Sequence, residues 1–171
     1  WRGSTSYLAI SMDNTNDITA VQFNIGIPNQ MKIGDKAFRL TDRASDHIVE
    51  ARKTRSEDGL DWYLVMAYSP SNALFTGRTG KIVEIRFTMD ERVAEGVSLM
   101  PVISDGVMST PDRKNVIQSV ETGCISIEYG PDLVLKVDLY LVALESQNNI
   151  CPQISYQIHR QKDKRPKNFY L

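Results

Sequence analysis

The 171-residue chain lacks most of the residues and patterns that catalysis or membrane insertion requires. It has two histidines, so the commonest general base near neutral pH is scarce. It has two cysteines, Cys124 and Cys151, which fit a reduced pair, a disulfide or two small buried apolar residues. No apolar run approaches the roughly 18 residues that span a bilayer. We therefore expect no transmembrane segment and little catalytic equipment.

An excess of charge of one sign is also absent, because 20 Lys and Arg stand against 21 Asp and Glu, a formal net charge of -1. Residues 160–171 carry a net charge of +4, so residues 1–159 carry -5. A negatively charged domain has no basic field to attract a nucleic acid. The basic tail lacks interleaved aromatic residues, so we expect no nucleic-acid partner.

The chain does contain period-two alternation of apolar and polar residues, the pattern of half-buried strands. The alternating segments lie at residues 8–12, 21–27, 83–89, 97–103 and 125–129, with shorter ones near 38–40 and 47–50. Residues 60–69 are apolar on both parities, which predicts a strand in the middle of a sheet. Turn residues separate these segments, and no helical period occurs before residue 130. The sequence therefore predicts an all-β sandwich of two sheets.

Local signals refine this prediction. The Asx-rich stretch at residues 13–17 predicts a turn that joins the first two strands into a hairpin. Pro101 cannot donate to a ladder, which places residues 97–103 at a sheet edge. The polar stretch at residues 32–55 suits short edge strands. Residues 133–141 favour a strand because Lys136 and Asp138 share a parity, although their apolar residues also fit a helix.

The composition changes at Gly130 and Pro131. We expect a sandwich domain over residues 1–130 and a C-terminal extension over residues 131–171 that ends in a flexible basic tail. No signal peptide is present in this chain, and we expect any targeting signal to have been removed.

The best catalytic candidate is His47, which follows Ser45 and Asp46. Adjacent residues of a strand point to opposite faces, so these three side chains do not converge as a triad. The chain also lacks the common nucleophile, zinc and phosphate-loop motifs. We expect no enzyme activity and interpret His47 as a structural residue.

Asp13 and Asp17 are the candidate metal ligands, because Ca²⁺ is bound by several carboxylate and carbonyl oxygens. The segment lacks the EF-hand pattern, since Ile18 replaces the glycine at position six and Asn24 the glutamate at position twelve. A looser structural calcium site and a simple Asx-rich turn are the two interpretations. No other cofactor is expected.

Trp62, Tyr63 and Tyr68 are the candidate binding aromatics. Trp62 and Tyr68 share a parity with Leu64 and Met66, which predicts that both point into the core. Tyr63 has the opposite parity and is the better candidate for an exposed contact.

Three segments, at residues 18–28, 39–47 and 68–85, carry patterns that can be compared with known families. Together they resemble the cohesin-like domains of extracellular bacterial proteins. Residues 18–28 are similar to an early strand of that family that reads Ala-Phe-Gln-Phe-Asp-hydrophobic and ends in Pro. Leu40, Arg43 and His47 match a Leu-x-x-Arg-x-x-x-His element. Residues 68–85 are similar to a strand-turn-strand element of the form Ser-x-x-x-x-x-Phe-x-Gly-x-x-Gly-x-[Val/Ile].

This resemblance, over roughly residues 6–129, implies a jelly-roll sandwich of about nine strands without catalysis, a fold shared by cohesins and several carbohydrate-binding modules. Cohesins bind dockerins through one sheet face. The sequence after Gly130 lacks the Asp-x-Asn-x-Asp-Gly loop of a dockerin. The resemblance implies an extracellular or cell-surface module that binds a protein partner, a dockerin or another module. A carbohydrate-binding module that recognises a polysaccharide is the alternative.

Overall fold

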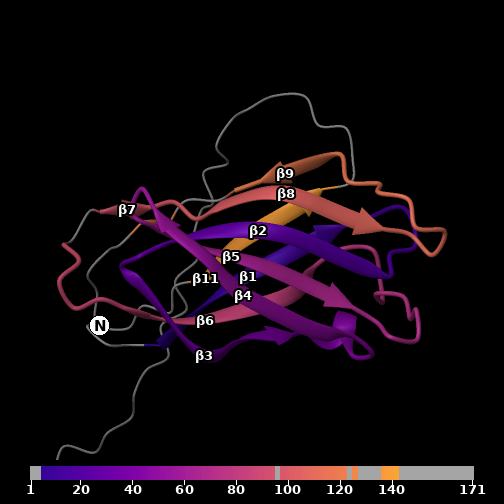
Figure 1. The fold of residues 1–171 in the computed structure, drawn as a ribbon, viewed down its shortest axis with the longest axis horizontal. Coiled ribbons are helices and arrows are strands. Elements are labelled where there is room, and N and C mark those ends of the chain that lie inside the picture. The colour runs from indigo at the N-terminus through magenta and orange to yellow at the C-terminus, as the bar shows by residue number, and fades with distance from the viewer. Residues whose placement is uncertain (1–4, 95–96, 123–124, 127–135, 143–171) are drawn as a thin grey trace, which may run out of the picture.

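The computed structural model describes residues 5–94, 97–122, 125–126 and 136–142. Its strands are β1 (Thr5–Asp13), β2 (Ala20–Pro28), β3 (Met31–Leu40), β4 (Ile48–Glu57), β5 (Leu60–Tyr68), β6 (Lys81–Met89), β7 (Ser98–Leu99), β8 (Val102–Ser109), β9 (Ser119–Glu121), β10 (Ile125–Ser126) and β11 (Lys136–Val142). Within these ranges there is one 3₁₀ turn, η1 (Asp42–Ala44), and no α-helix. In the view of Figure 1, the strands of one layer lie in front of the strands of the other.

One layer is a five-stranded sheet in the order β3-β6-β1-β11-β9, and the other is a four-stranded sheet in the order β4-β5-β2-β8. Strands β7 and β10 form a separate two-stranded ladder. The pairing of β1 with β11 is parallel, and the other ladders are antiparallel. The predicted all-β sandwich of two sheets is confirmed, and its two main sheets hold nine strands.

The core is built from the alternating apolar residues of the central strands. On β2, Phe23 and Ile25 are fully buried, whereas Gln22, which directly precedes Phe23 and faces the other side of the strand, is exposed. The other strands contribute Leu8, Ile10 and Met12 from β1, Val65 and Ala67 from β5, and Val83, Ile85 and Phe87 from β6. Burying one such large side chain stabilises the fold by roughly 1.5–3 kcal/mol. This burial determines which face of each strand turns inward.

The predicted hairpin of the first two strands is wrong. β1 pairs with β6 and β11 in one sheet, whereas β2 pairs with β5 and β8 in the other. The loop at residues 14–19 crosses from one layer to the other. Both strands present one apolar face to the shared core. Two strands show this same pattern whether they pair within one sheet or face each other across the sandwich, so the pattern alone does not identify a hairpin.

The prediction that residues 60–69 form an inner strand is confirmed, whereas the single edge strand predicted over residues 97–103 is wrong, because the segment divides into two strands of different sheets. β5 lies between β4 and β2, inside its sheet. Pro101 separates β7 from β8, and β8 forms an edge of the four-stranded sheet. The short strands predicted near residues 38–40 and 47–50 belong to the longer strands β3 and β4, which are also edges.

β3 leaves its ladder near the middle. Ile33 lies opposite Phe87 and Phe38 lies opposite Ile85, so residues 34–37 bulge out against the single residue Arg86. Lys36 in this bulge has a φ of 53°, in the left-handed region. The pairing of β3 with β6 resumes at Phe38, so the bulge interrupts the ladder only locally.

Residues 136–142 form a strand, β11, as their alternation favoured. β11 lies between β1 and β9, so a strand beyond residue 130 takes part in the five-stranded sheet. Cys124, Cys151, Tyr129 and the basic tail lie outside the described residues. In the part of the chain that the structure describes, no helix is long and apolar enough to cross a membrane.

Candidate interaction surface

The central strand β5 turns four large side chains away from the core. Val65 and Ala67 are fully buried between the sheets. Because successive residues of a strand face opposite sides, the residues of the other parity face outward. These outward side chains, all half-buried, are Trp62, Leu64, Met66 and Tyr68.

The predicted orientation of the three aromatics is therefore reversed. Trp62 and Tyr68 lie on the outer face of the sheet, whereas Tyr63 packs against the core. The ring centroid of Tyr63 lies 5.5 Å from that of Phe38. The pattern was ambiguous because residues 60–69 are apolar on both parities. On the inner face, the large Phe23 of β2 lies directly opposite Val65 of β5. The small side chains of Val65 and Ala67 fill the space beside the Phe23 ring.

Two further apolar side chains extend the outward row. Ile48 of β4 is directly opposite Tyr68 and is 44% exposed. Val102 of β8 is opposite Gly26 of β2, which is itself opposite Trp62, and Val102 is 37% exposed. Directly opposite residues share a face of the sheet. We call the resulting set the outer apolar surface: Ile48, Trp62, Leu64, Met66, Tyr68 and Val102.

Trp62 is covered on both sides of its ring. A Cβ at Gly26 would lie 3.0 Å from two atoms of the indole, so the ring rests on the β2 backbone. The guanidinium of Arg55, a residue of β4, lies 4.6 Å from the centroid of the Trp62 ring and makes a cation–π contact with it. Arg55 also pairs with Glu57 at 3.0 Å. Trp62 is thus held in place and offers little of its ring face to a ligand.

Several polar side chains beside the outer apolar surface are already paired. Asn24 donates to Asp105 at 2.8 Å, and Ser104 donates to the same carboxylate at 3.0 Å. These hydrogen bonds, with the nearby charge of Arg55, hold the pKa of Asp105 below its usual value. At the other end Tyr68 donates to Glu50 at 2.7 Å, which raises the pKa of Tyr68.

A groove with a volume of about 970 Å³ opens between the edge strands β3 and β4. Its lining includes Tyr63, the bulge at residues 34–37, and Glu50, Ala51 and Arg52 of β4. Burial raises the pKa of the Tyr63 hydroxyl. The aromatic that the sequence proposed for an exposed contact therefore lines this groove.

Two of the three segments that carry the sequence resemblance, the one with Arg43 and His47 and the one with Phe75 and the glycines, contact each other. Arg43 donates from Nε to the carbonyl of Thr76 at 2.7 Å, and from Nη1 to those of Met12 at 2.6 Å and Gly80 at 2.7 Å. Its Nη2 donates to Asn14 Oδ1 at 2.9 Å and to the carbonyl of Gly77 at 3.3 Å. Gly77 and Gly80 have φ values of 71° and 111°, which favour glycine. Arg43 therefore holds the glycine turn of the second motif.

His47 makes the second contact between the motifs. It is 8% exposed, and its ring stacks on Phe75 with 3.9 Å between centroids. The Thr19 backbone lies close, but neither ring nitrogen has a hydrogen-bond partner of good geometry among the described residues. Burial lowers the pKa of His47. Ser45 and Asp46 lie in the exposed turn after η1, so the three side chains form no catalytic group.

The oxygens of the Asx-rich loop are largely used within the fold. Asp17 pairs with Arg78 at 2.8 Å. Asn14 accepts from Arg43 and donates to the carbonyl of Asn16 at 2.7 Å. Asp13 lies at the end of β1, and one of its carboxylate oxygens is buried without a partner in the described chain. Among the described residues, no group of three or more His, Cys, Asp or Glu side chains is placed to hold a metal ion.

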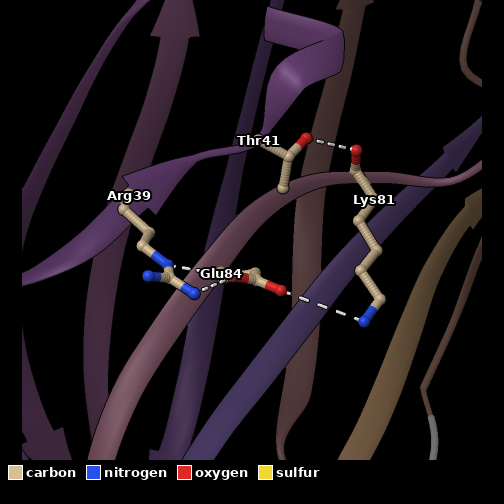
Figure 2. Close-up of polar contacts among 4 residues, drawn as sticks. All are labelled: Arg39, Thr41, Lys81 and Glu84. Atoms are coloured by element: carbon tan, nitrogen blue, oxygen red, sulfur yellow. Dashed lines mark hydrogen bonds and ion pairs between the residues drawn. The ribbon is translucent and has the colours of Figure 1, made fainter.

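The outer face of the five-stranded sheet is different in character. Figure 2 shows Glu84 of β6 between Arg39 of β3 and Lys81. Arg39 donates from Nε to Glu84 at 2.9 Å, and its guanidinium lies 4.4 Å from the ring centroid of Tyr7. Thr41 donates to the Lys81 carbonyl (Figure 2). The described part of this face is a charged network, whereas the four-stranded sheet carries the apolar row.

Sequence reasoning missed Ile48, Leu64, Met66 and Val102 as surface residues. The available signal was the excess of apolar residues in β5, because a strand with one buried face needs only one apolar parity. The partners across the sheet depend on register, which the alternation alone does not give.

The fold is similar to solved cohesin domains. The sixth cohesin of scaffoldin B from Acetivibrio cellulolyticus, solved in complex with a mutant Cel5 dockerin, has a TM-score of 0.52 at 12% identity and covers 75% of this chain and 100% of its own. CaCohA2 from Clostridium acetobutylicum, solved in complex with a CaDoc0917 variant, has a TM-score of 0.53 at 9% identity and covers 82% of this chain and 89% of its own.

Sequence comparison alone does not reach this likeness. The chain matches no protein-family model and no curated protein. At 9–12% identity the likeness concerns the arrangement of strands. The chain is a β-sandwich with a cohesin-like fold.

Proposed function

We propose that this chain is a non-catalytic binding module that holds a protein partner on the outer apolar surface. The observation that carries the proposal is the row of half-buried apolar side chains on β5, extended by exposed Ile48 and Val102. Protein interfaces have an apolar centre and a polar rim. In the rim, Asp105 and Glu50 already have hydrogen-bond partners, whereas the exposed Arg52, directly opposite Leu64, has none among the described residues.

The fold supports a dockerin-type module as the first class of partner. The sixth cohesin of scaffoldin B was solved in complex with a dockerin. Cohesin domains of this kind are parts of extracellular or cell-surface scaffolds, and we propose the same setting for this chain. We also propose that it has no enzyme activity, because His47 stacks in the fold beside Phe75 rather than facing a nucleophile.

The polysaccharide alternative is less well supported. Sugar rings stack on exposed aromatic faces, and Trp62 is covered by Gly26 on one side and Arg55 on the other. The hydroxyl of Tyr68 is occupied by Glu50. Leu64 and Met66 separate these two aromatics along β5, so the surface lacks a continuous aromatic platform.

The test compares the two classes of ligand. The purified chain is titrated calorimetrically against a panel of dockerin modules and run in affinity gels that contain soluble polysaccharides. We expect heat of binding with at least one protein module and no retardation by any glycan. Retardation by a glycan, with no binding across the protein panel, would reject the proposal.

A further inference from the structure

The free edge of β4 is available for pairing. β4 has ten residues, and within the described chain it forms a ladder with β5 alone. The unpaired N–H and C=O groups of such an edge can accept another strand. A groove of about 970 Å³ borders this edge at Ala51 and Arg52, and the bulge at residues 34–37 of β3 lines it as well.

The charges on β4 are complementary to themselves when the strand is reversed. If two copies of β4 run antiparallel with Ala51 opposite Ala51, then Glu50 of each copy lies opposite Arg52 of the other. Directly opposite residues in antiparallel strands share a face, so both pairs form on the outer side of the joined sheet. Ala51 at the symmetry axis is small and exposed, so the two backbones meet without a clash there. We propose that two copies of this chain form a two-fold dimer through their β4 edges in this register.

The neighbouring two-fold registers are unfavourable. Centring the pair on Glu50 sets two carboxylates against each other, and centring it on Arg52 sets two guanidinium groups against each other. Centring it on Lys53 does the same with two ammonium groups. Like charges directly opposite destabilise a sheet. The β-bulge between Lys53 and Arg55 then ends the regular ladder, so pairing covers residues 48–54.

The paired groups are free to make these contacts. Arg52 is exposed and has no hydrogen bond or ion pair with another described residue. Tyr68 uses Oε1 of Glu50, which leaves the other carboxylate oxygen to accept from the partner copy's guanidinium. The cations of β4 that lie next along the strand are engaged elsewhere: Lys53 pairs with Asp61 at 2.8 Å and Arg55 with Glu57.

The dimer would join two four-stranded sheets into one sheet of eight strands. Because the axis is perpendicular to the sheet, the outer apolar surfaces of both copies would face the same side. The dimer would thus present two adjacent binding faces. The inference depends only on β4 and not on the proposed binding function.

The test is sedimentation velocity of the full chain and of charge variants over a concentration series. The wild type is expected to approach twice its mass of 19.3 kDa as the concentration rises. Glu50→Arg or Arg52→Glu each replaces two attractions by two repulsions, so each should weaken the dimer at least about tenfold. An equimolar mixture of the two single variants restores both pairs, as does the double variant, and both should dimerise again.

Two exposed charged residues outside β4 provide the control variants, which are Arg86→Glu on β6 and Glu91→Arg in the turn that follows. Far-ultraviolet circular dichroism checks that every variant is folded. The controls should dimerise like the wild type. A wild type that stays monomeric throughout the series would overturn the proposal. A dimer that the β4 reversals leave intact, or single variants that fail to dimerise when mixed, would overturn it as well.

Discussion

Arg43 donates five hydrogen bonds to oxygens from β1, the loop after it and the turn before β6. Four of the five acceptors are backbone carbonyls, three of them in the turn before β6 and one at Met12 near the end of β1. Burial lowers the pKa of Arg43, and the charge of Asp13 offsets part of this effect. At the residue scale, the charged motif position serves the fold and not the binding surface.

Replacing Arg43 should destabilise the protein. Arg43→Ala leaves the acceptors of Met12, Asn14 and the glycine turn without their donor, so we expect a loss of about 2–4 kcal/mol in the free energy of unfolding. Arg43→Lys should recover little, because an ammonium group lacks the planar fork of five donors. Urea denaturation measures the change, and Arg92→Ala in an exposed turn serves as control. Equal midpoints for Arg43→Ala and the control would show that the network adds no stability.

His47 should make stability depend on pH. Its pKa is lowered in the folded state by burial, whereas the unfolded chain has the ordinary value of 6.5. Between the two values the unfolded state binds more protons, so stability is full above about pH 6.5 and falls as the pH drops below it. The slope from this group is at most about 1.4 kcal/mol per pH unit.

The pH effect is isolated by comparison with His47→Phe, which keeps an aromatic ring against Phe75. Thermal unfolding of both proteins between about pH 5 and 7.5 should give a difference that widens toward acid pH in favour of the variant. Parallel curves for the two proteins would contradict a lowered pKa in the folded state.

At the element scale, the sequence pattern located the strands well because alternation reports burial directly. From Val21 to Ile27 on β2 and from Val83 to Phe87 on β6, the large apolar residues lie on one parity and are buried. β5 carries apolar residues on both parities, so the inward face was determined by packing against Phe23 and not by the pattern. The pairing of β1 also escaped prediction, since strand partners depend on topology and register rather than on local hydropathy.

β11 is the element whose contribution is most easily tested. It pairs with β1 over seven register positions and also with β9. A chain that ends at residue 130 loses this strand and exposes one edge of β1. We expect it to be less stable by about 3 kcal/mol or more than a chain that ends at residue 145. Urea midpoints of the two chains give the comparison, and equal midpoints would place β11 outside the cooperative unit.

At the scale of the whole molecule, the two sheets present different outer faces. The described part of the five-stranded sheet carries Arg39, Glu84 and Lys81 in a charged network. The four-stranded sheet carries the outer apolar surface, beside which Asp105 and Glu50 are already hydrogen-bonded. The net charge of -1 does not reveal the charged character of one face or the apolar character of the other, because a sum over the chain carries no information about where side chains lie. The proposed function therefore depends on an arrangement that composition does not report.

The central claim is that the outer apolar surface binds a protein partner, and Leu64 lies in the middle of it. The most direct measurement is calorimetric titration with a dockerin-type module that the wild-type chain binds. The wild type, Leu64→Asp and Arg86→Glu are each titrated with this module, and all three proteins are checked for folding. An aspartate in the apolar centre should weaken binding by about 2 kcal/mol or more, roughly thirtyfold, while Arg86→Glu on the opposite sheet should bind like the wild type. Unchanged affinity for a folded Leu64→Asp variant would contradict the account.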